Sequence, residues 1–323
     1  MGDIIVQKYG GSSVATTEKI ITIAKRLIER KKTNPKIVVV VSAMGDTTDD
    51  YISLAKEITD TPDKRELDVL MSTGEMISAS LLAMSLKSMG CDAISYNAYQ
   101  LDIQTSGTHG KSLIDDIDVS KIEKSLDEGK IVVVTGFQGV TKDGFFTTLG
   151  RGGSDTSACI LGVALKAKEI DIYTDVDGIM TADPRMVEDA SLINEMTYNE
   201  VFQLADQGAK VIHPKAVALA KKGNVPLVIK NTMNDSKGTV IKSSVSEEEK
   251  RLISGITHLN NRVQVRVRLS DNKGKGTYRN LLELLAKNHI SLDLINIFPE
   301  HQMFTIDATE KEKLSEIMSK AEI

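Results

Sequence analysis

Short apolar runs alternate with helix-length amphipathic stretches along roughly the first 240 residues. The runs at 37–42 and 131–135 are continuous and rich in β-branched residues, which predicts strands covered on both faces. Residues 15–32 and 66–89 repeat apolar side chains at helical spacing. Further strands are expected at 4–8, 93–96, 170–174 and 225–230, and a further helix at 156–168. This order predicts a three-layer α/β/α fold around a mostly parallel sheet.

The pattern changes near residue 243. Residues 243–250 are polar and acidic, as in a linker or a short solvated helix. Strict apolar–polar alternation follows at 262–269, then a helix at 277–288, strands at 291–297 and 302–307, and a helix from Glu310. This βαββα order predicts a small ferredoxin-like module. The chain is therefore expected to hold one domain over residues 1–243 and a second region over 250–323.

Composition removes several classes of function. The 323 residues carry a net charge of −5, and only 4% are aromatic, with no Trp, which argues against a nucleic-acid partner. Cys91, Cys159 and five scattered histidines lack metal-ligand spacing, which argues against a zinc enzyme. The longest β-rich apolar run, 37–41, is about a quarter of a membrane span, and no basic leader precedes the first strand. We expect a cytoplasmic protein without a membrane partner.

A glycine turn lies between the first strand and the first helix. It contains Lys8, Gly10, Gly11 and Ser12. Backbone amides near adjacent glycines, a helix N-terminus and a lysine together favour a phosphate group. The alternative is a tight turn in which Ser12 or Ser13 caps the helix. Walker and protein-kinase motifs are absent.

Two further loops follow strands and precede helices. Residues 42–48 lie where open α/β sheets bind ligands, although a polar loop that caps the next helix would have the same composition. Residues 148–156 surround Arg151 with three glycines. A glycine-rich turn does not need a guanidinium group, so this loop predicts a second anion site with a bidentate donor.

Acidic and basic residues elsewhere are more ambiguous. The acidic segments at 173–178 and 181–185 suit magnesium or ribose hydroxyls, and equally suit Asx turns. Glu75 and Lys210 stand at positions typical of helix starts, where each taken alone is read as a solvated charge.

Taken together and in this order, these segments closely resemble the aspartokinase family of the amino-acid-kinase superfamily. The matching segments are 8–13, 42–48, 72–76, 150–155, 173–185 and 208–215, which span nearly all of the first 240 residues. The resemblance implies an amino-acid-kinase catalytic domain at 1–243. It also implies an ACT regulatory region at 250–323.

The resemblance implies ATP-dependent phosphorylation of the β-carboxylate of L-aspartate, the first step of lysine, threonine and methionine biosynthesis. A carboxylate with a pKa of about 3.9 is already a nucleophile, so no general base is needed. Mg²⁺ would be held mainly through the ATP phosphates. The implied catalytic residues are Lys8, Asp155 and Lys210. The implied aspartate-binding residues are Ser42, Thr48, Glu75 and Arg151. The implied ATP-binding residues are Lys8, Gly10, Gly11, Ser12, Thr174, Asp175, Asp177, Met180, Arg185 and Lys210.

The C-terminal region departs from the family pattern of two interleaved ACT modules. Residues 252–260 resemble the opening strand of one module and the residues from 262 resemble the other, with the chain stopping at Ile323. Residues 271–276 lack the usual Pro-Gly pair, so an effector, lysine or threonine, is an open expectation. An unfinished sheet edge predicts a homodimer through residues 262–323.

Two other functions remain open at this point. One is an amino-acid sensor without turnover, against which the presence of Lys8, Glu75, Arg151 and Asp155 argues. The other is a kinase for another small carboxylate or for a nucleoside monophosphate. A nicotinamide dehydrogenase is disfavoured because no Gly-x-Gly-x-x-Gly follows the first strand.

Overall fold

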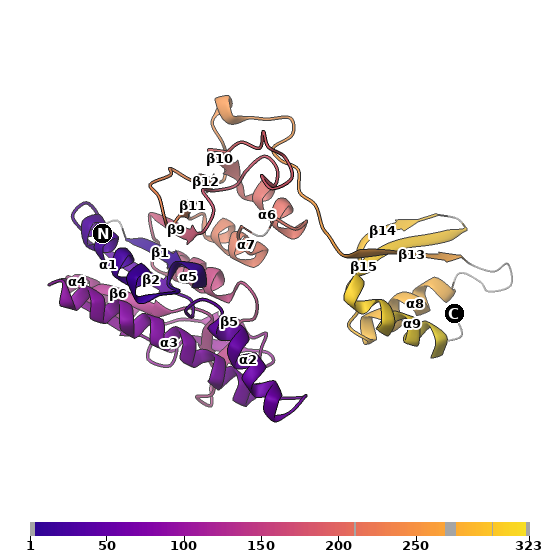
Figure 1. The fold of residues 1–323 in the computed structure, drawn as a ribbon, viewed down its shortest axis with the longest axis horizontal. Coiled ribbons are helices and arrows are strands. Elements are labelled where there is room, and N and C mark those ends of the chain that lie inside the picture. Colours follow the sequence, from indigo (N-terminus) through magenta and orange to yellow (C-terminus); the bar gives the residue numbers. More distant parts are fainter. Residues whose placement is uncertain (1–3, 210, 269–275, 299, 321–323) are drawn as a thin grey trace. The chain divides into compact units, whose positions relative to one another are not determined.

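The chain forms two compact units, Met1–Thr257 and His258–Ile323 (Figure 1). The computed structural model describes residues 4–320, apart from 210, 269–275 and 299.

The first unit is built on an eight-stranded sheet. Its strands are β1 (Ile5–Tyr9), β2 (Ile37–Val41), β3 (Ala93–Tyr96), β6 (Ile131–Thr135), β9 (Glu169–Thr174), β10 (Glu195–Thr197), β11 (Leu227–Asn231) and β12 (Thr239–Lys242). The order across the sheet is β10-β12-β11-β9-β1-β2-β6-β3. The β11–β12 pair is antiparallel and the other pairs are parallel. The predicted mostly parallel sheet is confirmed.

Helices cover both faces of this sheet. They are α1 (Thr17–Lys31), α2 (Thr47–Ile58), α3 (Lys64–Ser88), α4 (Ser120–Asp127), α5 (Gly153–Ala164), α6 (Tyr198–Asp206) and α7 (Pro214–Gly223). Val39 and Val41 of β2 join the core with α1 and α3. Val38 and Val40 join the opposite core, with α4, α5, α6 and α7. Alternate residues of one buried strand thus supply both cores, as three layers require. Figure 1 shows α3 as the long helix of its layer.

Among the described helices, α3 meets the length and hydropathy of a membrane span. Half of that apolar stretch is buried inside the unit, as in the core helix of a globular domain.

A small four-stranded sheet between residues 104 and 148 was not expected from the sequence. It comprises β4 (Gln104–Ser106), β5 (Leu113–Asp116), β7 (Gln138–Val140) and β8 (Phe146–Thr148), in the order β5-β4-β7-β8. Strands of three or four residues with mixed polarity are too short to show a clear period. β8 packs against α3, the helix that also covers the central sheet.

One predicted helix start and one predicted strand are wrong. The helix expected at 156–168 begins at Gly153 in α5. The strand expected at 252–260 is absent, and a 3-10 helix, η2 (Glu247–Glu249), is followed by a segment without strand pairing. Ile256 N–H donates to the carbonyl of Thr181, and the Ser254 hydroxyl donates to Glu200. These contacts hold the segment to the first unit instead of a ladder.

The second unit has the predicted βαββα order. Its elements are β13 (Arg262–Arg268), α8 (Gly276–Lys287), β14 (Asp293–Ile297), β15 (His301–Asp307), the 3-10 helix η3 (Ala308–Glu310) and α9 (Lys311–Lys320). The sheet order is β13-β15-β14, with antiparallel pairs. Leu281 and Leu285 of α8 and Leu314 of α9 pack on Phe304 and Ile306 of β15. One face of the sheet is therefore covered by both helices.

Candidate active site

A cavity of about 860 Å³ opens in the first unit, where β1 and β2 end and α5 begins. Parallel α/β sheets bind ligands at this edge, and the volume lies in the usual range for small-molecule sites. Seven of the residues singled out from the sequence line it, namely Lys8, Gly11, Ser42, Thr48, Glu75, Arg151 and Asp155.

Lys8 and Asp155 form an ion pair at the base of this cavity. Lys8 lies near the end of β1 and Asp155 in the first turn of α5, and Nζ lies 2.7 Å from Oδ1. Their side chains are only 13% and 12% exposed, so the attraction is weakly screened by water. The second oxygen of Asp155 accepts a longer hydrogen bond, 3.4 Å, from the amide of His213. The pair thus places one cation beside an oriented helix N-terminus.

The glycine turn packs tightly against the loop that follows β2. The short 3-10 helix η1 (Gly11–Ser13) begins at the turn. The amide of Gly45 donates to the carbonyl of Gly11, and a Cβ on Gly11 would lie 2.8 Å from the Gly45 oxygen. The alternative of a serine-capped helix is wrong, because the side chain of Thr16 caps α1 and the Ser13 hydroxyl instead contacts Thr232. Glycine is needed here for the close approach of two loops.

The Arg151 loop uses glycine for a different reason. Gly150 and Gly152 adopt φ of 75° and 73°, a region that other residues rarely enter. A Cβ on Gly152 would lie 2.2 Å from the ring of His213. Arg151 itself is exposed and lines the cavity. Within the part of the chain that the structure describes, its guanidinium has no acidic partner and is available to an anionic ligand.

Glu75 is not the solvated charge at a helix start that its sequence context suggested. It lies in the middle of α3, is 2% exposed and still lines the cavity. Its Oε1 accepts from the amide of Ala43 at 3.1 Å, while Oε2 is buried and has no partner among the described residues. Burial raises the pKa of Glu75 to about 8, and the hydrogen bond from Ala43 opposes this rise. A buried acceptor beside a cavity is suited to a cationic ligand group.

Lys8 and Gly11 are the described nucleotide residues that line this cavity, and the others lie outside its lining. Those outside are Gly10, Ser12, Thr174, Asp175, Asp177, Met180 and Arg185. Asp177 accepts from the side chains of Asn231 and Asn234, which lowers its pKa. The Arg185 guanidinium is bidentate to Asp183. Lys210 lies outside the described residues.

Sequence reasoning missed several residues of the cavity wall. Lys111, Phe137, His213 and Lys215 also line it, as does Thr148, which begins the 148–156 loop already identified as an anion site. His213 and Lys215 fall within a segment already matched to the family, whereas Lys111 lies in a polar loop without a recognisable motif. A second cavity, of about 370 Å³, is lined by Arg26, Tyr173 and residues around Asn231. Of this lining, the sequence singled out only Tyr173, at the start of the acidic segment 173–178.

Sequence comparisons identify relatives of the chain. Residues 3–231 match the model of the amino acid kinase family. The chain is 47% identical over 292 residues to an aspartokinase of Geobacillus stearothermophilus, covering 90% of this chain and 72% of that protein. It is 46% identical to aspartokinase 2 of Bacillus subtilis strain 168, covering 90% of this chain and 71% of that protein.

Solved structures of the same family share the fold. The complex of Escherichia coli aspartokinase III with aspartate and ADP superposes with a TM-score of 0.82 at 26% identity, covering 94% of this chain and 79% of that one. The complex of the same enzyme with lysine and aspartate gives 0.79 at 26% identity, covering 98% and 83%. The family match over most of the first unit and these relatives together establish that the chain belongs to the amino acid kinase family, among its aspartokinases.

Proposed function

We propose that this chain transfers the γ-phosphoryl group of ATP to the β-carboxylate of L-aspartate and so forms 4-phospho-L-aspartate and ADP. The observation that carries the proposal is that one cavity presents both a guanidinium and a buried carboxyl group. Among the described residues, the Arg151 guanidinium has no acidic partner and the buried Oε2 of Glu75 has no hydrogen-bond partner. An α-amino acid brings the two complementary groups, a carboxylate and an ammonium. Aspartate also binds to the solved Escherichia coli relative.

The reaction needs little covalent help from the protein. A carboxylate oxygen of aspartate forms a bond to the γ-phosphorus as the bond from that phosphorus to the β–γ bridging oxygen breaks, and ADP leaves with the electron pair. No proton moves, because a carboxylate with a pKa of about 3.9 is already ionised at neutral pH. The main difficulty is to bring two anions together, so the catalyst must supply positive charge and fixed amides.

The described residues are suited to that task. We assign Lys8 and the amides of Gly10 and Gly11 to the ATP phosphates, with Asp155 holding the Lys8 ammonium at 2.7 Å. The Gly10 amide donates to the Tyr173 carbonyl at 3.3 Å and would exchange this partner for a phosphate. Ser42 and Thr48 would line the aspartate pocket beside Glu75 and Arg151. Ser12, Thr174, Asp175, Asp177, Met180, Arg185 and Lys210 complete the proposed nucleotide contacts. Because Arg185 is held by Asp183 here, nucleotide binding would require Arg185 to exchange that partner for a phosphate.

We propose that Mg²⁺ reaches the site bound to ATP. The described residues contain no group of three or more His, Cys, Asp or Glu side chains arranged to hold a metal ion. Mg²⁺ keeps several water ligands and commonly bridges phosphates, so it does not need a cluster of three protein ligands. The ion would neutralise charge on the transferred phosphoryl group.

The hydroxylamine trap for acyl phosphates tests the function directly. Wild type should form trapped product with Mg-ATP and L-aspartate but not with L-glutamate. Arg151→Ala should raise the KM for aspartate by about 10²-fold, as expected for loss of a charge-assisted bidentate contact. Arg30→Ala is the matched control. Arg30 pairs with Glu169 at the start of β9, whereas the cavity lies where the strands β1 and β2 end. Binding of both ligands without product would favour the amino-acid sensor instead.

For the second unit we propose a regulatory role. We assign residues 1–243 to catalysis and 250–323 to regulation by lysine or threonine; lysine is bound in one solved relative. We also propose a homodimer through residues 262–323. β14 is an edge strand on which Leu294, Ile295 and Ile297 are exposed, and such an edge favours pairing with another chain.

A further inference from the structure

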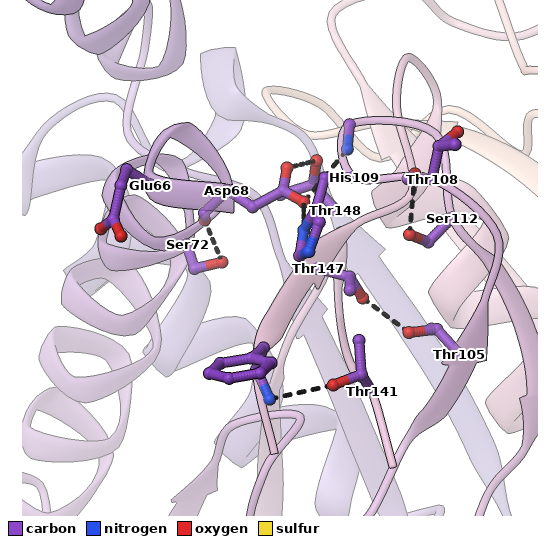
Figure 2. A network of polar contacts seen from close by, with 12 residues as sticks. Glu66, Asp68, Ser72, Thr105, Thr108, His109, Ser112, Thr141, Thr147 and Thr148 are labelled. Carbon is purple, nitrogen blue, oxygen red and sulfur yellow. Dashed lines mark hydrogen bonds and ion pairs between the residues drawn. The ribbon is translucent and has the colours of Figure 1, made fainter. Parts of the chain in front are cut away.

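A completely buried carboxylate lies behind the cavity and has no role in the function proposed so far. Asp68 is 0% exposed and occupies the second turn of α3, seven residues before Glu75. Residues seven apart in a helix lie on the same face, so Asp68 and Glu75 face the same region of the unit. Figure 2 shows Asp68 at the centre of a network of polar contacts.

Three donors converge on the two oxygens of Asp68. The Thr148 hydroxyl donates to Oδ1 at 2.5 Å. The amide of Gly110 donates to Oδ2 at 3.0 Å, and His109 Nδ1, in its protonated tautomer, donates to the same oxygen at 2.7 Å. An ionised carboxylate has only acceptor atoms, so it can accept all three hydrogen bonds.

These donors belong to two segments of the cavity wall that are far apart in sequence. Gly110 and Lys111 line the cavity in the loop between β4 and β5, and Thr148 begins the run that leads to Arg151. The Ser112 amide also donates to the Thr148 carbonyl at 2.9 Å, so the two segments touch. The hydrogen bonds to Asp68 therefore hold both wall segments against α3.

We propose that Asp68 is a positioning residue that holds these two wall segments, and through them Arg151 and Lys111, in register with Glu75 for aspartate. The inference rests on the proposed function. Without the Asp68 carboxylate, the buried Thr148 hydroxyl and the half-buried Gly110 amide would each lose their hydrogen-bond partner. The segments would then move to find water or new partners, because an unsatisfied buried donor is unfavourable. Arg151 lies three residues beyond Thr148 and would move with it.

The inference predicts an effect on one substrate only. Lys8 and Gly11, which we assign to ATP, lie on β1 and the turn after it, and not on the two segments held by Asp68. Asp68→Ala should therefore raise the KM for aspartate by about 10–10²-fold, the scale expected when a binding group moves by about 1 Å. The KM for ATP should stay within about twofold of wild type, on the scale of a neutral surface change.

Asp68→Asn provides the rescue. Its amide oxygen can accept from Gly110 and its amide nitrogen can donate to the Thr148 hydroxyl oxygen, so two of three contacts can persist without the charge. We expect an aspartate KM close to wild type. Asp115→Ala is the matched control, since it removes an exposed hydrogen bond from Ser106 in the same β4–β5 hairpin without touching the cavity. It should change neither KM.

The experiment combines steady-state kinetics with calorimetric titration of aspartate. A folded Asp68→Ala protein with an unchanged aspartate KM, or with equal changes in both KM values, overturns the inference. So does Asp68→Asn behaving like Asp68→Ala. If Asp68→Ala does not fold, Thr148→Val and His109→Ala replace it, because each removes one donor to Asp68. An unchanged aspartate KM in both of these variants would also overturn the inference. Wild type forming no aspartyl phosphate, while aspartate binding still weakens in the variants, would refute the proposed function and leave the positioning role standing.

Discussion

Glu75 makes aspartate binding dependent on pH in a predictable direction. Burial holds the pKa of its carboxyl group at about 8 in the free protein, far above the ordinary value of 4.5. An ammonium group binds to the ionised form, so aspartate must select the ionised fraction or drive off the proton. At pH 7 about a tenth of the protein has Glu75 ionised, at pH 6 about a hundredth, and at pH 8 about half.

The apparent Kd for aspartate should therefore fall about 50-fold between pH 6 and pH 8. Each pH unit in the lower part of this range corresponds to about 1.4 kcal/mol of binding free energy. His213 also lines the cavity, but burial lowers its pKa from 6.5, so it is largely neutral above pH 7 and adds little there. Glu75→Gln should remove most of the pH dependence and bind aspartate more weakly at pH 8.

Calorimetry in buffers of different ionisation enthalpy measures this linkage. Wild type should release close to one proton per aspartate bound at pH 7, and Glu75→Gln should release almost none. An aspartate affinity that is flat from pH 6 to 8, with no proton release, would refute the assignment of Glu75 to the ammonium group.

Stability provides a separate check on the buried carboxyl group. The unfolded chain loses this proton near pH 4.5 and the folded chain near pH 8, so the folded state binds more protons between these values. Wild type should then lose stability relative to Glu75→Gln as the pH rises through this window, by a limit on the order of 5 kcal/mol. Urea unfolding of both proteins at pH 5 and pH 8.5 measures the difference, in which the contributions of other groups cancel. A constant difference would show that Glu75 is ionised in the free protein at neutral pH.

Two other outcomes follow from the geometry. Gly152→Ala should lose about 1–2 kcal/mol for the left-handed backbone and a further 1–3 kcal/mol for the collision with His213. Gly129→Ala has a similar φ of 77° but no atom within 4 Å of a Cβ, so urea unfolding should show only the smaller loss, and equal losses would contradict the packing argument. The proposed homodimer should give the mass of two chains in light scattering at micromolar concentration, and Leu294→Asp together with Ile297→Asp, on exposed positions of β14, should halve it. A wild-type monomer at that concentration would contradict it.

The sequence alone was sufficient for the central sheet and the core helices. Continuous β-branched runs such as β2 are long enough, and apolar enough, to predict strands buried on both faces. Glycine turns after strands identified the binding edge, because parallel strands all end at the same edge. Hence Lys8, Ser42 and Arg151 were expected near a ligand before any contact was known, and all three line one cavity.

Tertiary structure decided the features that depend on burial and on distant partners. The sequence around Glu75 is typical of an exposed charge on a helix. In the folded chain Glu75 packs against the loop that contains Ala43 and is only 2% exposed. Lys8 and Asp155 are separated by 147 positions, and Asp68 and Thr148 by 80, so no local period can pair them. The segment at 252–260 resembles the opening strand of an ACT module but lacks a ladder partner within the described residues. The local sequence pattern indicates which secondary structure a segment favours and which of its faces is buried. The desolvation and charge pairing that define this site arise only when distant segments fold together.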